Sequence, residues 1–463
     1  MVRHAGAAIG REEPLAGSAG GEGVAAYDVV VIGGGASGLA AAIAAARSGA
    51  RTLIIERDAA CGLPILATGN GRCNVSNARL DPARYRHPRA ARTVMGAEPE
   101  RELGAFFASM GLVTCAIEGR LYPITRRAES VRDCLLAAAR AAGVEMRCDA
   151  QVTDADGRGD TWRLTTREPE RPITVREHST DFKAELRGAR KALKGARLVA
   201  RELRARAVIL ACGGTSAEIA ELFDLQHLAE EPVLCPVACA VPQGVSHATW
   251  NALDGLRVEA AIELSPVGGV PWREEGEVLF RPYGISGIVA FDLSRRVEAA
   301  GQSVFWLDLF PTLGTGDLIG LLRHREDVRG TFDGTDPAWF DGLLARPLAQ
   351  LVLELLASDY RTLSDGLRGD ALTTCAKLCH ELPLTATGRT ELRQAQVRRG
   401  GIPIDAVDGD TLRAHADEDA GRPAPLFACG EALDQDADCG GFNLAWAWAS
   451  GLRAGSAAAR DVR

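Results

Sequence analysis

Three glycines near the N-terminus have the spacing of a phosphate-binding turn. Gly33, Gly35 and Gly38 follow the apolar run 27–32 (YDVVVI), which is typical of a strand buried on both faces, and precede an alanine-rich helical stretch. In such a unit the first glycine permits the tight turn, the second lets a pyrophosphate approach the backbone, and the third lets helix and strand pack closely. The helix N-terminus then offers free N–H groups and the positive end of its dipole. The pattern predicts a dinucleotide site that includes Ser37.

An acidic residue ends the next apolar run. Glu56 follows residues 51–55 (RTLII), about 20 residues after the glycine turn, where a carboxylate accepts hydrogen bonds from both hydroxyls of a ribose. An acid at this place disfavours a 2′-phosphate, so the expected nucleotide is FAD or NAD and not NADP. Arg57 beside it is a further candidate. We find one such fingerprint in the sequence, so one tightly held dinucleotide is expected.

Three later segments favour FAD. Residues 208–214 (VILACGG) and 425–431 (PLFACGE) have the pattern of strands that run into a glycine turn, and 439–443 (CGGFN) opens a helix expected at 444–453. A helix N-terminus there would stabilise negative charge on a reduced flavin ring. The alternative is that these segments are ordinary strand ends and helix caps. The cofactor-binding residues expected in and beside these segments are Cys212, Gly213, Gly430, Glu431, Gly440, Gly441, Asn443 and Leu444, and Val152 is expected in addition.

The block 69–77 (GNGRCNVSN) carries a specific resemblance. It is similar to the GGGRCNxTN signature of the BaiN-like or YhiN-like FAD-binding oxidoreductases, which are also labelled aminoacetone oxidase-type. The resemblance continues at 119–123 (GRLYP), 400–402 (GGI), 430–434 (GEALD) and 440–451 (GGFNLAWAWASG). It implies an α/β fold with a Rossmann-like two-dinucleotide-fold FAD domain, which is split by an inserted β-rich domain and a small helical subdomain.

Three residues of this block are cofactor-site candidates. Arg72 could bind a flavin phosphate, a ring carbonyl or an anionic group of the substrate, and the amide of Asn74 could bond near the cofactor. Cys73 is either a structural or flavin-lining thiol or a redox thiol. The C-x4-C partner of a redox dithiol would be residue 78, which is Ala78, so the first interpretation is favoured.

The substrate side departs from the family pattern. In the segment 279–288 (LFRPYGISGI), which resembles LFTHxGLSGP, Pro282 stands in place of the usual histidine and Ile288 in place of the usual proline. The cofactor site is therefore expected to be retained, whereas the substrate of other family members cannot be assigned directly to this protein.

The resemblance implies an FAD-dependent enzyme with NADH or NADPH as electron donor. The favoured hypothesis is reduction of an activated C=C bond in an enone-type small molecule by hydride transfer from flavin N5. The candidate proton donors are Tyr122 and Tyr283, and Arg281 or Arg120 could polarise a carbonyl. One alternative is an amine (aminoacetone-type) oxidase that uses O2. Another is a flavin-binding redox sensor or RNA-modification factor.

Composition limits the remaining possibilities. The 463 residues are 46% hydrophobic and 25% charged with a net charge of −8, which excludes a disordered or collagenous chain and argues against a general nucleic-acid binder. No apolar run reaches the ~20 residues of a membrane span, so no membrane partner is expected. Twelve cysteines without a recognisable signal peptide indicate reduced thiols in a cytoplasmic protein. The C-x3-C pairs at 235–239 and 375–379 are more typical of core residues than of a metal site, and no metal is expected.

The coarse pattern predicts six segments: a disordered tail at 1–24, the first part of the FAD-binding domain at 25–230, the first part of an inserted β-rich substrate domain at 231–310, a helical subdomain at 311–370, a return through the inserted domain at 371–395, and the second part of the FAD-binding domain at 396–463. The first part includes a basic excursion at 158–206 with a net charge of +7, built from strands at 162–166 and 197–200 around a helix or loop at 184–195. This excursion is either a solvated surface or, less favoured, an arm for an anionic partner such as a phosphorylated cofactor or RNA.

Overall fold

The computed structural model describes residues 25–157, 160–177, 179–265, 271–298, 300–358, 371–415 and 424–463. The tail predicted at 1–24 lies outside the described residues, as does the end of the predicted helical subdomain at 359–370.

A parallel sheet forms the centre of the first domain. Its strands are β6 (Glu145–Arg147), β2 (Thr52–Ile55), β1 (Ala25–Ile32), β9 (Leu198–Leu210) and β18 (Leu426–Ala428), adjacent in that order. The apolar residues at 29–31 and 207–210 are completely buried, and α1 and α13 pack on these strands and on each other. All five strands are parallel, so their carboxyl ends meet at one edge, where α/β sheets bind their ligands.

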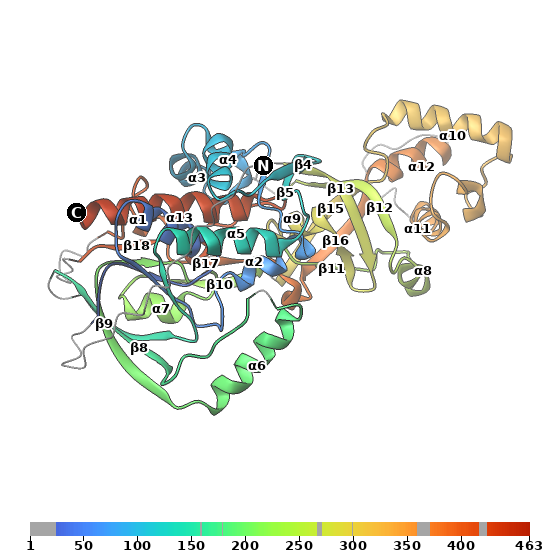
Figure 1. Ribbon diagram of the computed structural model, residues 1–463. Coiled ribbons are helices and arrows are strands. Elements are labelled where there is room, and N and C mark those ends of the chain that lie inside the picture. The colour runs from blue at the N-terminus through green and yellow to red at the C-terminus, as the bar shows by residue number, and fades with distance from the viewer. Residues whose placement is uncertain are drawn as a thin grey trace, which may run out of the picture.

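The basic excursion continues this sheet as a meander. β7 (Gln151–Asp156), β8 (Trp162–Pro169) and β9 pair antiparallel in sequence. The strand predicted at 197–200 and the one predicted to open the segment 208–214 are in fact parts of β9, a single strand of 13 residues. Arginines on its exposed face, at 201, 204 and 206, hide the continuity in the sequence, while Leu203 and Ala205 between them are completely buried. The connection between β8 and β9 contains the helix α6 (Phe182–Gly195), which lies at the lower edge of the molecule in Figure 1.

Two helices pack in parallel against the sheet. α1 (Ala36–Arg47) follows the glycine turn, and α13 (Phe442–Asp461) extends well beyond the predicted 444–453. Methyl groups at Gly451 and Gly455 would lie 2.4 Å from the carbonyl oxygen of Ser37 and 2.1 Å from that of Ala41. The two backbones therefore touch, and only glycine permits this distance.

The remaining elements of this domain cover the sheet or connect it to the rest of the chain. They are α2 (Leu63–Ala67), β3 (Ser76–Asn77), α3 (Pro88–Met95), α4 (Pro99–Ser109), β4 (Thr114–Ile117), β5 (Arg120–Pro123), α5 (Ala128–Ala141), α7 (Ala217–Leu222), β10 (Leu228–Val233) and β17 (Val397–Gly401). β10 and β17 pair antiparallel where the chain leaves and re-enters the sheet domain.

A closed barrel forms the inserted β-rich part. Its strands are β11 (Val237–Ala240), β14 (Gly284–Ser286), β13 (Trp272–Arg281), β12 (Arg257–Leu264), β15 (Ala300–Asp308) and β16 (Leu382–Arg389), and α8 (His247–Ala252) and α9 (Ile288–Ser294) accompany them. Parallel sheet, barrel and helices together confirm the predicted fold class.

A helical group lies at the end of the barrel remote from the sheet (Figure 1). It contains α10 (Thr315–Arg329), α11 (Arg346–Ala357) and α12 (Ala371–His380). α12 falls in the segment predicted to return through the barrel, so the return consists of β16 alone. The apolar face of α12 packs on α10 and α11, and this face includes the buried Cys375 and Cys379.

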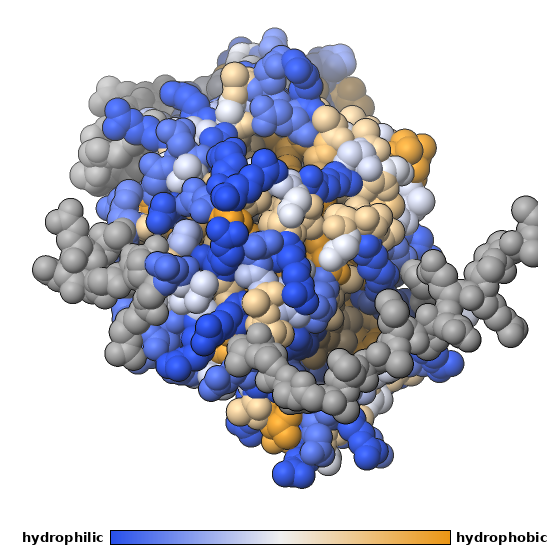
Figure 2. All heavy atoms as spheres, turned by 60° about the vertical axis from the view of Figure 1, so that its left-hand side comes forward, coloured by the Kyte–Doolittle hydropathy of each residue, from blue (hydrophilic) through white to orange (hydrophobic). Residues whose placement is uncertain are grey.

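In the described part of the chain no helix is long and apolar enough to cross a membrane. Figure 2 shows strongly hydrophobic residues in small separate groups among hydrophilic ones on one face of the molecule.

Candidate cofactor site

A cavity of about 370 Å³ lies at the carboxyl edge of the parallel sheet. The ends of β1, β2 and β9 and the first turns of α1 and α13 form its wall. Eleven of the predicted cofactor residues line it, although they come from five separate parts of the sequence. They are Gly33, Gly35, Ser37, Glu56, Arg57, Val152, Cys212, Gly213, Glu431, Asn443 and Leu444.

The glycine turn has three different local requirements. A methyl group at Gly33 would lie 2.4 Å from the carbonyl oxygen of Ala211, and one at Gly38 would lie 1.9 Å from that of Gly33. These two glycines therefore allow the turn and α1 to pack on β9. A methyl group at Gly35 would have no neighbour within 4 Å and would enter open space in the cavity wall. Gly35 thus leaves room for a ligand to approach the backbone.

Two helix N-termini face the same cavity. The first intrahelical bond of α1 runs from Leu39 N to Gly35 O (2.9 Å), and that of α13 from Ala445 N to Gly441 O (2.9 Å). The N–H groups before them have no partner within their helices, and neither N-cap has a side-chain hydrogen bond. Since Ser37, the second residue of α1, lies beside Gly451, the tenth residue of α13, the two helix starts are offset by about 12 Å along the helix axes. The wall therefore offers two positive helix ends to an elongated anionic ligand.

Glu56 closes the cavity on the β2 side. Its carboxylate accepts hydrogen bonds from the backbone N–H groups of Gly34 (2.6 Å) and Asp58 (2.8 Å), and its side chain is 9% exposed. Burial raises its pKa, while the two N–H groups oppose that shift. Arg57 reaches across the cavity and donates to the hydroxyl of Thr215 (3.0 Å). Both oxygens of Glu56 keep a free lone pair for ribose hydroxyls.

Glu431 supplies a further carboxyl group of the wall. It accepts a hydrogen bond from the backbone N–H of Arg398 (2.6 Å), and desolvation raises its pKa to about 7. Gly430 before it does not line the cavity, since a methyl group there would lie 2.3 Å from the hydroxyl oxygen of Ser37. Gly430 therefore permits β18 to approach α1.

The block 69–77 holds the start of α13 and does not line the cavity. Asn77 donates to the carbonyl oxygen of Gly440 (2.9 Å). The amide of Asn74, in the orientation that its neighbours require, accepts from the N–H of Gly441 (3.0 Å). Cys73 is completely buried with a left-handed backbone (φ 55°), and burial raises the pKa of its thiol to about 11. These contacts assign Asn74, Gly440 and Gly441 a positioning role and make Cys73 a structural thiol.

The four candidate catalytic residues divide into two groups, and none lines the cavity. Tyr122 is buried on β5, with the guanidinium of Arg72 5.5 Å from its ring centre, and Arg120 begins the same strand beside Glu118 (3.8 Å). Arg281 and Tyr283 lie on the barrel, at the turn between β13 and β14. Arg281 forms an ion pair with Asp254 (3.1 Å). Desolvation raises the pKa of Tyr283, and Arg281 opposes that shift.

A buried ionic cluster between α9 and the chain before α13 was not predicted. Arg295 is 6% exposed and forms ion pairs with Asp436 and Asp438, whose side chains are at most 1% exposed. Asp292 accepts from the N–H of Cys439 (2.6 Å), and its pKa is raised to about 7, mainly by burial and next by Asp438. The alternating aspartates at 434, 436 and 438 were the available sequence signal. The cluster connects the barrel to the turn that starts α13.

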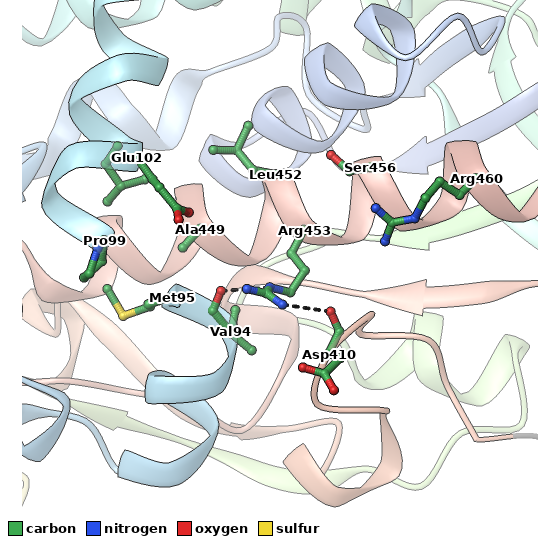
Figure 3. A pocket seen from close by; sticks show the side chains of 11 residues that line it. Val94, Met95, Pro99, Glu102, Asp410, Ala449, Leu452, Arg453, Ser456 and Arg460 are labelled. Atoms are coloured by element: carbon green, nitrogen blue, oxygen red, sulfur yellow. Dashed lines mark hydrogen bonds between the residues drawn. The ribbon is translucent and has the colours of Figure 1, made fainter. Parts of the chain in front are cut away.

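A second cavity, of about 260 Å³, lies on the other side of α13 against α3 and α4 (Figure 3). Arg453 points into it but donates to the carbonyl oxygens of Val94 (2.8 Å) and Asp410 (3.0 Å). Its guanidinium caps the C-terminal end of α3, so its role is structural. In the ranges that the structure describes, no cluster of three or more His, Cys, Asp or Glu residues has metal-binding geometry.

Comparison with known proteins agrees with this geometry. Residues 27–177 match the family described as HI0933-like protein Rossmann domain. A 3-dehydro-bile acid delta(4,6)-reductase of Clostridium scindens is 30% identical over 442 residues, which cover 93% of this chain and 98% of that protein. The chain belongs to this BaiN-like family. It is an FAD-dependent oxidoreductase.

Two further proteins match most of the chain at lower identity. A ribosomal RNA dihydrouridine synthase of Haemophilus influenzae is 22% identical over 91% of this chain and 96% of that protein. Among solved structures, a 3-ketosteroid-delta4-(5alpha)-dehydrogenase of Rhodococcus jostii RHA1 covers 94% of this chain and 97% of that one at 16% identity, with a TM-score of 0.44.

The cavity of this family member fits FAD. The open space at Gly35 and the unpaired N–H groups of α1 suit the diphosphate, Glu56 suits a ribose, and the N-terminus of α13 suits the electron-rich edge of the flavin.

Proposed function

We propose that the protein reduces an activated C=C bond of a small enone-type molecule, with NADH or NADPH as electron donor. The similarity to a 3-dehydro-bile acid delta(4,6)-reductase along nearly the whole chain carries this proposal. The overall change adds a hydride to the β-carbon and a proton to the α-carbon, while the nicotinamide is oxidised. Bound flavin supplies the two-electron transfer between donor and substrate.

In this proposal the residues of the chain bind the flavin, orient the substrate and provide the proton. The unpaired N–H groups at the start of α13 stabilise negative charge at their end of the cavity, and Asn74 and Asn77 hold this turn in place. Tyr122 is the first candidate proton donor. Its strand, β5, pairs with β3, and β3 belongs to the block 69–77 that contacts the start of α13. The guanidinium of Arg72 lies 5.5 Å from the centre of its ring.

Arg120 is the candidate for polarising the substrate carbonyl. It precedes Tyr122 by two residues on β5, and its charge acts on Cys439, directly before the Gly440–Gly441 turn. Arg281 is less suited to this role because its ion pair with Asp254 (3.1 Å) is closer than that of Arg120 with Glu118 (3.8 Å). With its reduced thiols and a nicotinamide donor, we place the reaction in the cytoplasm.

The test is an anaerobic titration of the purified holoenzyme followed by its visible spectrum. We expect NADH or NADPH to bleach the flavin and a steroid enone to restore its colour. Tyr122→Phe should retain the flavin and reduce turnover by about 10²-fold or more. Tyr283→Phe, on the barrel turn, is the matched comparison and should turn over normally.

Two results would contradict the proposal. Flavin that ignores both nicotinamides, but is reduced by an amine and reoxidised by O2, would identify an amine oxidase. Flavin that responds to neither pair would favour a redox sensor or an RNA-modification factor.

A further inference from the structure

One face of α6 carries a row of cations. Lysines and arginines occupy five of its 14 positions, and all five are exposed. At 3.6 residues per turn their directions fall within about 100° around the helix axis. We call this row the basic face; it consists of Lys183, Arg187, Arg190, Lys191 and Lys194.

The opposite side of α6 is fixed against the protein. Ala189 is 5% exposed, and the guanidinium of Arg132 on α5 lies 4.7 Å from the ring centre of Phe182. The side chain of Asp181 caps the helix by accepting from the N–H of Ala184 (2.8 Å). The helix is therefore held with its basic face outward, beyond β8 and β9 at the edge of the molecule (Figure 1).

The positive charge of this face is not neutralised internally. Arg187 lies 4.0 Å from Asp181, and in the described ranges none of the other four cations has a carboxylate within ion-pairing distance. The single acid of α6, Glu185, pairs with Arg176 on another side of the helix. This concentration stands out because the whole chain has a net charge of −8. Such a local field attracts polyanions.

We propose that the basic face of α6 binds the sugar–phosphate backbone of RNA. From Lys183 to Lys194 the row is about 16 Å long, enough for several successive phosphates. Every exposed polar side chain of α6 is a lysine or an arginine, which pairs with phosphates, and double-stranded RNA is usually bound through its backbone and helix shape. The large apolar side chains of α6, at Phe182, Leu186 and Leu193, are half-buried, so the helix has no exposed large apolar side chain to insert into a membrane. This inference goes beyond the proposed reaction and does not depend on it.

The test compares two charge-matched variants of the full-length holoenzyme. In the first, Arg187→Glu, Lys191→Glu and Lys194→Glu reverse the basic face. In the control, Arg89→Glu, Arg92→Glu and Arg393→Glu reverse three exposed arginines elsewhere. Both variants change the net charge from −8 to −14. Flavin content and thermal unfolding establish that each is folded, and a version with Gln at 187, 191 and 194 keeps good helix formers in α6.

Binding is measured by fluorescence anisotropy with a labelled RNA duplex of about 20 base pairs, from about 50 to 200 mM salt. For the unmodified protein we expect a plot of log K against log salt with a slope of about −4, since up to five phosphates are contacted. The basic-face variants should bind at least about tenfold more weakly, with a slope less steep by about 2 to 3. The control should stay within about twofold of the unmodified protein.

Each other outcome overturns the proposal. Unchanged RNA affinity in the basic-face variants would show that α6 does not bind RNA. An equal loss of affinity in both charge-reversed variants would show that the net charge of the protein, and not α6, determines binding. Equal affinity for a DNA duplex of the same length, or binding to vesicles of anionic lipid in place of RNA, assigns the face to another polyanion.

Discussion

Replacing Gly38 by alanine should destabilise the fold, whereas replacing Gly35 should not. The new methyl group at Gly38 would lie 1.9 Å from the carbonyl oxygen of Gly33, about 1 Å short of the closest distance that such atoms adopt. α1 cannot move away freely, because Gly451 holds α13 directly against its other side. Overpacking of this kind costs up to about 3 kcal/mol. Alanine recovers about 1 kcal/mol through its helix propensity, so a net loss of about 2 kcal/mol is expected.

Gly35 provides the matched control within the same turn. Its backbone (φ −75°, ψ −163°) suits any residue, and a methyl group there would meet no atom within 4 Å. The free energy of unfolding of the apoprotein should therefore change by less than about 0.5 kcal/mol. The methyl group would, however, occupy the space that a diphosphate needs, so FAD affinity should fall at least about tenfold, or about 1.4 kcal/mol.

The assay pairs denaturant unfolding of the apoprotein with an FAD titration followed by flavin fluorescence. An unfolding midpoint of Gly38→Ala equal to that of the unmodified protein would refute the packing argument. Unchanged FAD affinity for Gly35→Ala would refute the placement of the ligand against this part of the backbone.

Three further changes test the site and its surroundings. Arg295→Met removes one cation from each of the buried Asp436 and Asp438, which keep Arg399 and Arg296, and should cost up to about 3 kcal/mol in denaturant unfolding; a midpoint like that of the unmodified protein would contradict this. The pKa of Asp292 in the folded protein is raised to about 7, so its contribution to the free energy of unfolding is lost as pH rises from about 4 to 7. Asp292→Asn should therefore become more stable relative to the unmodified protein between pH 5 and 8. A stability difference between the two proteins that does not change with pH would argue against the raised pKa. Glu56→Gln removes one carboxylate acceptor and should raise the FAD dissociation constant about 10- to 100-fold, measured by equilibrium fluorescence, with unchanged affinity as the contrary result.

The elements that could be predicted from the sequence are those with local signals. The strand–turn–helix unit around Gly33 combines a short β-branched run, a glycine turn and an alanine-rich helix, and each signal acts within a few residues. β9 was divided in two because its solvent-facing positions carry arginines that resemble a loop. The end of α13 was missed because its second half contains Gly455 and few large apolar residues, since it packs directly on the backbone of α1.

The parts of the site that could not be predicted depend on contacts between distant segments. Arg295 meets Asp436 across 141 residues of sequence, and no spacing rule connects them. Similarly, the block 69–77 was recognised as a motif, yet its place beside the start of α13 comes only from pairs such as Asn77 and Gly440. The sequence identified residues near a cofactor by their types. Only the structure shows which of them line the cavity and which hold the lining residues in place.

The parallel contact between α1 and α13 also has a consequence for biosynthesis. α1 leaves the ribosome more than 400 residues before the end of α13, and nine of its residues are buried in the finished protein. At about 5–20 residues per second, the part of its surface that α13 covers stays exposed for about 20 to 80 s. The barrel and helical group are made during this interval. We therefore expect a chaperone to bind the first domain of the nascent chain. The cofactor cavity is completed only when the first turns of α13, near the end of the sequence, have been translated.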